Sequence, residues 1–154
     1  MGLQQEIKKR QPFESPEQEA CLNLVRTGDL LQLDFTRLFR EHGLSPPLYN
    51  VLRILRGAGG AGLPCLEIAG RMIGSVPDIT RLIDRLEESG HVERTRSTDD
   101  RRVVLVQITP AGLKLLSKLD KPVLELHQRQ LGHLSRQELS QLNRLLLKAR
   151  RAES

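Results

Sequence analysis

Hydrophobic periodicity switches from a helical repeat to a two-residue repeat directly after Gly90, and this switch restricts the folds that the chain can adopt. Before Gly90, four apolar residues recur at positions i, i+3, i+4 and i+7 of an amphipathic helix: Ile79, Leu82, Ile83 and Leu86. After Gly90, residues 91–95 and 103–108 are β-prone and flank a charged, turn-forming segment. The pattern predicts a helix followed at once by a β-hairpin with a charged tip.

Helical periodicity and helix-start signals cover most of the chain before this unit. Residues 16–40 place apolar side chains at intervals of three and four, so we expect a long amphipathic helix there. Ser45 followed by Pro46 predicts the start of a second helix, because serine caps the first amides and proline fits the first helical position. A short helix is expected over residues 64–72. Residues 1–15 are polar and aperiodic, and are expected to form a mobile arm.

Similar signals place the helices on either side of the hairpin. Ser75 precedes Asp78 by three residues, the spacing of a capping box in which the serine hydroxyl accepts a hydrogen bond from the Asp78 amide. Thr109 followed by proline predicts the start of a further helix, which Pro122 is expected to interrupt and kink. Residues 135–138 form another capping box, which opens the last helix.

Composition excludes several classes of protein. Aromatic residues make up 3% of the 154 residues, so we expect no large aromatic-lined cavity. No apolar run approaches the ~20 residues of a membrane span, which excludes an integral membrane protein. The first twenty residues hold no apolar segment of signal-peptide length, so a cytoplasmic protein is expected. Cys21 and Cys65 form neither a disulfide framework nor a CxxC pair.

Sequence signals for catalysis or for a bound cofactor are absent. The chain has no nucleophile elbow, and its glycine-rich segment over residues 57–62 lacks the GKS/T of a phosphate-binding loop. The four histidines show neither HExxH nor paired-ligand spacing, so we predict no metal site and no cofactor. A protein that is not an enzyme is expected.

The net charge of +5 permits nucleic-acid binding, and its distribution along the chain is more informative than its size. Four arginines surround the predicted hairpin tip: Arg94, Arg96, Arg101 and Arg102. The capped helix is slightly acidic by contrast. We expect at least one of its exposed arginines, Arg81 or Arg85, to pair with a carboxylate of the same helix. The candidate acids are Asp78, Asp84 and Glu88.

The order of these elements is that of a winged helix-turn-helix. We therefore predict a mainly α-helical fold with a small β-hairpin wing, in which residues 45–109 form a DNA-binding lobe. The capped helix fits the major groove, and arginines on the wing enter the narrower, more negative minor groove. Residues 16–44 and 110–151 are expected to form a helical dimerisation region, because their apolar seams are suited to packing against a second copy.

Three stretches of the chain, in a fixed order, carry a resemblance to a known family. They are TRLIDRLE at residues 80–87, DDRR at residues 99–102 and LVQITPAG at residues 105–112. These residues resemble the MarR family of transcriptional regulators, and the resemblance covers about residues 16–150. It implies a homodimer that binds a pseudo-palindromic DNA operator, most often as a repressor. In many relatives a small aromatic or anionic ligand releases the DNA.

The resemblance also implies roles for individual residues. Asp100 and Arg102 match the family's Asp-x-Arg wing element, in which the acid orients the tip and an arginine reaches the minor groove. An acid beside two arginines is also, on chemical grounds, a charge-assisted clamp. The candidate DNA-contacting residues are Ser75, Thr80, Arg81, Arg85, Arg94, Arg96, Asp100, Arg101 and Arg102. The candidates for lining an effector pocket are Phe39, His42, Tyr49 and Arg53.

Two alternative functions stay open at this point. Some members of the family sense hydroperoxides through a cysteine on the first helix, so Cys21 is a candidate redox-sensing thiol; the competing interpretation is a buried structural thiol. The second alternative is a winged helix that binds a protein. Such a module needs no wing arginines and shows little salt-dependent affinity for duplex DNA.

Overall fold

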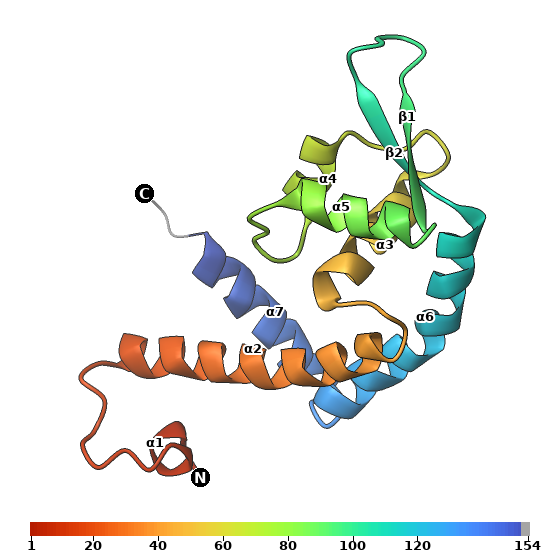
Figure 1. Cartoon of the computed structure of the whole chain (residues 1–154). Helices are drawn as coiled ribbons and strands as arrows, with labels where there is room; N and C mark the ends of the chain where they lie inside the picture. The colour runs from red at the N-terminus through yellow and green to blue at the C-terminus, as the bar shows by residue number, and fades with distance from the viewer. Residues whose placement is uncertain (152–154) are drawn as a thin grey trace. The chain divides into compact units, whose positions relative to one another are not determined.

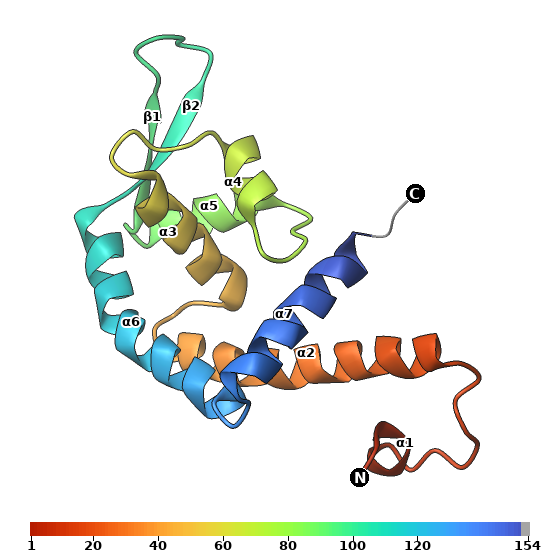
Figure 2. The same cartoon turned by 180° about the vertical axis from the view of Figure 1, so that it is seen from behind.

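Figures 1 and 2 show the computed structural model of the protein, which describes residues 1–151. The chain divides between Ser117 and Lys118 into two compact units. Along the described residues the elements are α1 (Leu3–Glu6), α2 (Pro16–Arg40), α3 (Pro46–Ala58), α4 (Cys65–Arg71), α5 (Ile79–Glu88), β1 (Val92–Arg96), β2 (Val104–Ile108), α6 (Pro110–Leu131) and α7 (Arg136–Arg150). The predicted mainly α-helical fold with one β-hairpin is confirmed.

Helix α3 forms the centre of the first unit. Its apolar stripe is 3% exposed or less and consists of Leu48, Val51, Leu52 and Leu55. The helix packs against α2, α4, α5 and β2. From α5, Ile83 and Leu86 are buried, and full burial of such side chains contributes about 1.5–3 kcal/mol each. Because the apolar stripe of α5 is buried in this core, the opposite face of α5 is left to solvent.

The two strands form an antiparallel hairpin whose loop projects away from helices α3, α4 and α5 (Figures 1 and 2). Val92 pairs with Ile108 at the base, and Arg96 pairs with Val104 near the tip. The hairpin is attached to the loop before α4, because Leu63 and Val106 exchange backbone hydrogen bonds of 3.0 and 2.8 Å. Gly62 permits this close approach: it has φ +73°, and a Cβ there would lie 2.6 Å from the Val106 carbonyl oxygen.

Three predicted helix caps are confirmed. Ser45 Oγ accepts a hydrogen bond from the Leu48 amide at 3.5 Å, and Thr109 Oγ1 accepts one from the Gly112 amide at 3.2 Å. Ser135 and Glu138 form the reciprocal capping box at the start of α7. These local signals place helix starts well because each cap satisfies amides that the first turn of a helix leaves unpaired.

The predicted capping box at Ser75 is wrong. Helix α5 begins at Ile79, and its cap is Asp78, whose Oδ1 accepts a hydrogen bond from the Arg81 amide at 3.2 Å. The physical reason is Pro77, since a residue that precedes proline is disfavoured in the helical region of backbone conformation. Helix α5 is therefore shorter than the sequence pattern indicated, and Ser75 lies in the exposed loop before it.

Two further segments differ in detail from the sequence expectation. Within the expected arm, α1 buries Leu3, and Glu6 Oε2 accepts a hydrogen bond from Arg26 Nε on α2 at 3.0 Å. The mobility of the arm stays a prediction. Helix α6 runs through Pro122 without the expected interruption. Because proline has no amide hydrogen, the Lys118 carbonyl lacks its usual helical donor.

The cap assignment makes a direct prediction about stability. Asp78→Ala is expected to lower the free energy of unfolding by about 1 kcal/mol, because the first turn of α5 loses its side-chain acceptor. Ser75→Ala, three residues earlier, is expected to change it by no more than about 0.5 kcal/mol, the usual range for an exposed surface position. Urea unfolding followed by circular dichroism measures both, and a larger loss for Ser75→Ala would restore the capping box.

Candidate nucleic-acid interface

Helix α5 presents a polar face opposite its buried stripe. Thr80, Arg81 and Arg85 are exposed on this face. Within residues 1–151, no ion pair joins the guanidinium of Arg81 or Arg85 to a carboxylate. The expectation that at least one of these arginines pairs within the helix is therefore wrong, and both guanidinium groups are available to a ligand.

Two carboxylates of α5, and that of its cap, are engaged elsewhere. Asp78 caps the helix, as described above. Asp84 Oδ1 accepts a hydrogen bond of 2.6 Å from Nη2 of Arg94 on β1, and Glu87 Oε1 accepts one of 2.8 Å from Nη1 of the same arginine. Asp84 and Glu87 do not compete for Arg81 and Arg85, because a cation from another element already neutralises part of their charge.

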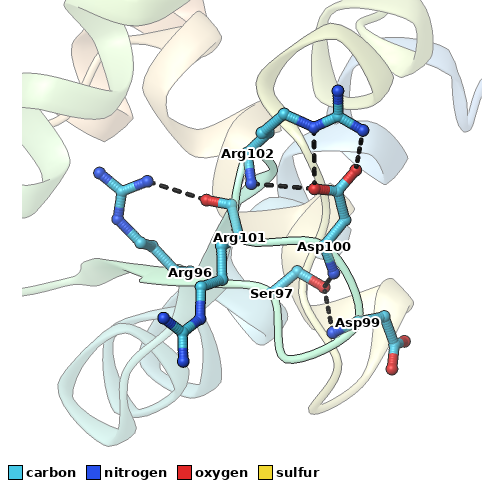
Figure 3. Close-up of polar contacts among 6 residues, drawn as sticks. All are labelled: Arg96, Ser97, Asp99, Asp100, Arg101 and Arg102. Atoms are coloured by element: carbon cyan, nitrogen blue, oxygen red, sulfur yellow. Dashed lines mark hydrogen bonds and ion pairs between the residues drawn. The ribbon is translucent and has the colours of Figure 1, made fainter.

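The hairpin tip is a well-defined turn, shown in Figure 3. Ser97 Oγ accepts hydrogen bonds from the amides of Asp99 and Asp100 at 3.2 and 3.5 Å. Arg96 Nη1 donates to the Arg101 carbonyl at 2.8 Å, across the mouth of the loop. The turn is thus held by its own side chains. These hydrogen bonds fix the backbone from which the arginine side chains of the tip extend.

Asp100 and Arg102 form a bidentate ion pair (Figure 3). Arg102 Nε donates to Asp100 Oδ1 at 3.2 Å and Nη2 donates to Oδ2 at 3.3 Å, while the Arg102 amide donates to Oδ1 at 3.0 Å. The side chain of Arg102 is 91% exposed, so solvent screens the pair and its energy is small. Asp100 therefore orients the guanidinium without burying it.

The same contacts lower the pKa of Asp100, first through the side-chain hydrogen bond from Arg102 and then through the backbone hydrogen bond. A carboxylate whose folded-state pKa is lowered keeps its partner at every pH above its usual range. The pair is consequently intact at neutral pH and is lost only as the pH falls through the lowered pKa of Asp100.

Arg94 has a different position from the other wing arginines. Its side chain is 23% exposed and is directed onto Asp84 and Glu87 of α5, not toward the hairpin tip. Burial alone lowers the pKa of Arg94, but the hydrogen bonds to the two carboxylates outweigh it and the pKa is raised. Arg94 is a candidate DNA contact from sequence, and that role stays a prediction; in the structure its guanidinium joins β1 to α5.

The candidate pocket residues lie around an aromatic stack between α2 and α3. Phe39 is 2% exposed, and its ring centroid lies 4.3 Å from that of Tyr49 and 5.8 Å from that of Phe35. Arg53 Nη1 donates to the Tyr49 hydroxyl at 3.2 Å. Phe35 was missed from sequence, although its spacing of four residues from Phe39 was a signal. His42 lies half-buried in the turn that follows α2.

Helix α2 carries an exposed apolar surface in the single chain. Every residue from 21 to 30 is exposed, and the large apolar side chains on α2 that are 40% exposed or more are Leu22, Leu24, Val25, Leu30 and Leu33. Cys21 lies at the start of this stretch and is exposed, so its interpretation as a buried thiol is wrong for the single chain. An exposed surface of this kind marks a site of association.

Helix α7 of the second unit shows a weaker form of the same pattern. Its predicted stripe of Leu139, Leu142 and Leu146 is half-buried, and Leu145 is 53% exposed. In the described part of the chain, no helix is long and apolar enough to cross a bilayer, and no group of three metal-ligating side chains comes together.

Comparison with known proteins agrees with this geometry. The MarR family model matches residues 44–104. The chain is 33% identical to the HTH-type transcriptional repressor IacR of Pseudomonas putida over 123 residues, which are 80% of this chain and 72% of the relative. It is 48% identical to a MarR transcription factor from Planctomyces limnophilus, whose crystal structure gives a TM-score of 0.67. The match covers 88% of this chain and 98% of that chain.

A further solved structure shows the same fold at low identity. Sco3205, a MarR family transcriptional regulator from Streptomyces coelicolor whose crystal structure is a complex with DNA, has a TM-score of 0.80 and 18% identity, with 93% of this chain and 92% of that chain covered. Fold, site and relatives together define a DNA-binding winged helix-turn-helix transcriptional regulator and not an enzyme. The chain belongs to the MarR family.

The Asp100–Arg102 pair makes a prediction in which charge and orientation have opposite effects. Asp100→Asn removes one negative charge, which by itself strengthens DNA binding, but it also breaks the ion pair that orients the Arg102 guanidinium. An exposed pair is worth about 0.2–1 kcal/mol, so we expect DNA affinity to fall by a factor of about two to five. Fluorescence anisotropy with a labelled duplex measures the change.

Asp99→Asn is the matched control, because it changes the charge identically at the neighbouring residue. Within residues 1–151, the Asp99 carboxylate takes part in no ion pair or hydrogen bond, so this variant is expected to bind DNA as tightly as the parent or more tightly. Equal affinities for the two variants would contradict the role given to Asp100.

Proposed function

We propose that the protein is a homodimeric repressor that binds a pseudo-palindromic DNA operator in the cytoplasm. The observation that carries the proposal is the combination of Arg81 and Arg85, available on the exposed face of α5, with Arg102 presented by Asp100 at the tip of the adjacent wing. Two separate cationic surfaces on one lobe suit the two grooves of a duplex. That the protein represses transcription and does not activate it is supported by the name of the relative IacR alone.

The two surfaces have different tasks in this proposal. Helix α5 enters the major groove, where one of Arg81 and Arg85 contacts a guanine edge and the other positions the helix on phosphate. Thr80 lies beside them, and Ser75 in the preceding loop is a further candidate for a phosphate contact. On the wing, Arg102 enters the minor groove while Arg96 and Arg101 lie at the same turn and contribute positive potential.

A homodimer gives the exposed apolar surface of α2 a partner. Two copies related by a two-fold axis bury the same surface on each chain, and such an interface is self-complementary. The dimer also sets the operator, because two α5 helices that enter successive major grooves must lie about one helical turn, roughly 34 Å, apart. A pseudo-palindrome with matching half-site spacing follows from this symmetry.

An effector is the least supported part of the proposal. The aromatic stack of Phe39 and Tyr49, with the Arg53 guanidinium beside it, offers the chemistry for a small aromatic or anionic molecule. The rings are in direct contact, so a ligand must displace part of the stack to enter. Regulation through the exposed Cys21 thiol is the alternative, and loss of DNA binding after treatment with a hydroperoxide, reversed by dithiothreitol, distinguishes it.

The test begins with selection of DNA by the purified protein from a randomised duplex library. A repressor of this class is expected to enrich one inverted repeat. On that operator, Arg102→Ala is expected to weaken affinity strongly and to reduce the slope of log affinity against log salt by about one for each phosphate that the variant no longer neutralises. The weakening is expected to be largest at A·T-rich flanks, where the minor groove is narrow.

Arg144→Ala provides a control for Arg102→Ala. It removes the same charge from an exposed position of α7, outside the proposed DNA-binding lobe. If both variants bound the operator as tightly as the parent at every salt concentration, the wing would have no part in binding. If the parent enriched no sequence and bound duplex DNA without salt dependence, the protein would be a protein-binding winged helix instead.

The dimer makes a separate prediction. Val25→Glu is expected to produce monomers at micromolar concentration, because Val25 is 65% exposed in the single chain and a buried charge without a partner opposes association. Leu66→Glu, at a position on α4 that is 85% exposed, is the control and is expected to stay dimeric. Sedimentation velocity distinguishes these states, and a folded monomer for the parent chain would contradict the proposal.

A further inference from the structure

We propose that Arg94 is a positioning residue, which, with Asp84 and Glu87, fixes the wing relative to helix α5 so that both engage one DNA site. The inference rests on the proposed function, since it concerns how the same two surfaces are aligned. It gives a wing arginine a role inside the protein in place of a contact with DNA.

Three contacts converge on Arg94. Its Nη2 donates to Asp84 at 2.6 Å, its Nη1 donates to Glu87 at 2.8 Å, and its backbone amide donates to the second Glu87 oxygen at 3.2 Å. Asp84 and Glu87 are three residues apart on α5, so they lie on the same side of the helix. The planar guanidinium thus spans two carboxylates of one helix while its own backbone is held by one of them.

The location of Arg94 in the hairpin allows these contacts to limit rotation of the wing relative to α5. Arg94 pairs with Val106 in the middle of the hairpin, between the buried base at Val92 and the tip. A two-stranded ribbon twists more freely than a larger sheet, so a small rotation at its middle moves the tip further. Beyond the Arg94 level, the described contacts of the hairpin tip are within the tip itself. Among the described hydrogen bonds and ion pairs, those of Arg94 are therefore the outermost that join the wing to α5, and they lie at the level of the Leu63–Val106 backbone hydrogen bonds on the other strand.

The same arrangement has an electrostatic consequence. Asp84 and Glu87 are 55% and 43% exposed on the helix proposed to face a polyanion, and Arg94 neutralises part of their charge. If Arg94 were a DNA contact, removing both acids would release it and strengthen binding. If Arg94 positions the wing, removing them loosens the hairpin and weakens recognition of the operator. The two roles predict opposite signs for the same substitution.

The experiment compares Asp84→Asn/Glu87→Gln with Glu88→Gln/Glu93→Gln. Both double variants remove two negative charges: the first removes both from α5, and the second removes one from α5 and one from β1. Within residues 1–151, Glu88 and Glu93 take part in no ion pair, so the second variant is a control for charge alone. The readout is the ratio of operator affinity to affinity for an unrelated duplex of equal length, which a uniform charge effect leaves almost unchanged.

For Asp84→Asn/Glu87→Gln we expect the ratio to fall about tenfold relative to the control variant, with loss of hydroxyl-radical protection in the minor groove at the operator flanks. Arg94→Lys keeps the charge but reaches one carboxylate at a time, so its affinity ratio is expected to fall only in part. Arg94→Ala loses both contacts, so its ratio is expected to fall further than that of Arg94→Lys. Circular dichroism and the thermal midpoint establish that each variant is folded.

Each outcome decides the proposal. The proposal would be overturned if the affinity ratio of Asp84→Asn/Glu87→Gln equalled or exceeded that of Glu88→Gln/Glu93→Gln, with the minor-groove protection intact. If Asp84→Asn/Glu87→Gln did not fold, parent-like affinity ratios for both Arg94→Lys and Arg94→Ala would overturn it equally. Failure of the parent protein to enrich any operator would instead overturn the proposed function, so the two failures are distinguishable.

Discussion

Burial of the apolar stripe of α5 in the core around α3 is the interaction on which the interface depends. Ile83 and Leu86 fix the rotation of α5 about its axis, since any other rotation would expose them to water. That rotation determines which side chains face outward, and they are Thr80, Arg81 and Arg85. The proposed recognition surface is thus a consequence of packing on the opposite side of the same helix.

Ion pairs then decide how the remaining charges are used. Asp78 is occupied as a helix cap, and Asp84 and Glu87 are occupied by Arg94, so these acids do not hold Arg81 or Arg85. At the tip, Asp100 orients Arg102 but does not bury it. These surface pairs contribute little to folding stability, so their importance lies in orientation.

Much of the fold could be predicted from the sequence because its signals are local. The bounds of α2, the caps at Ser45 and Thr109, and the two strands of the hairpin follow from periodicity and from residues adjacent in the chain. The misplaced cap at Ser75 is a conflict between two local rules, in which the restriction imposed by Pro77 outweighs the capping-box spacing.

The features of the site that the sequence did not predict are contacts between elements. The ion pairs of Arg94 were not predicted, because strand pairing turns its side chain toward α5 and its partner Asp84 lies ten residues away along the chain. The exposure of Cys21 was missed because helical periodicity does not say whether an apolar face is covered by the same chain or by a second one. Tertiary geometry supplies what spacing along the chain does not contain.

The central claim is that α5 and the wing of two chains engage one DNA site together. Methylation interference and hydroxyl-radical footprinting on the selected operator test it most directly, because they report major-groove and minor-groove contacts separately. We predict two major-groove contact regions about one helical turn apart, roughly 10–10.5 base pairs centre to centre, each flanked by minor-groove protection. A single protected half-site, or major-groove contacts without protection of the flanking minor groove, would contradict the claim.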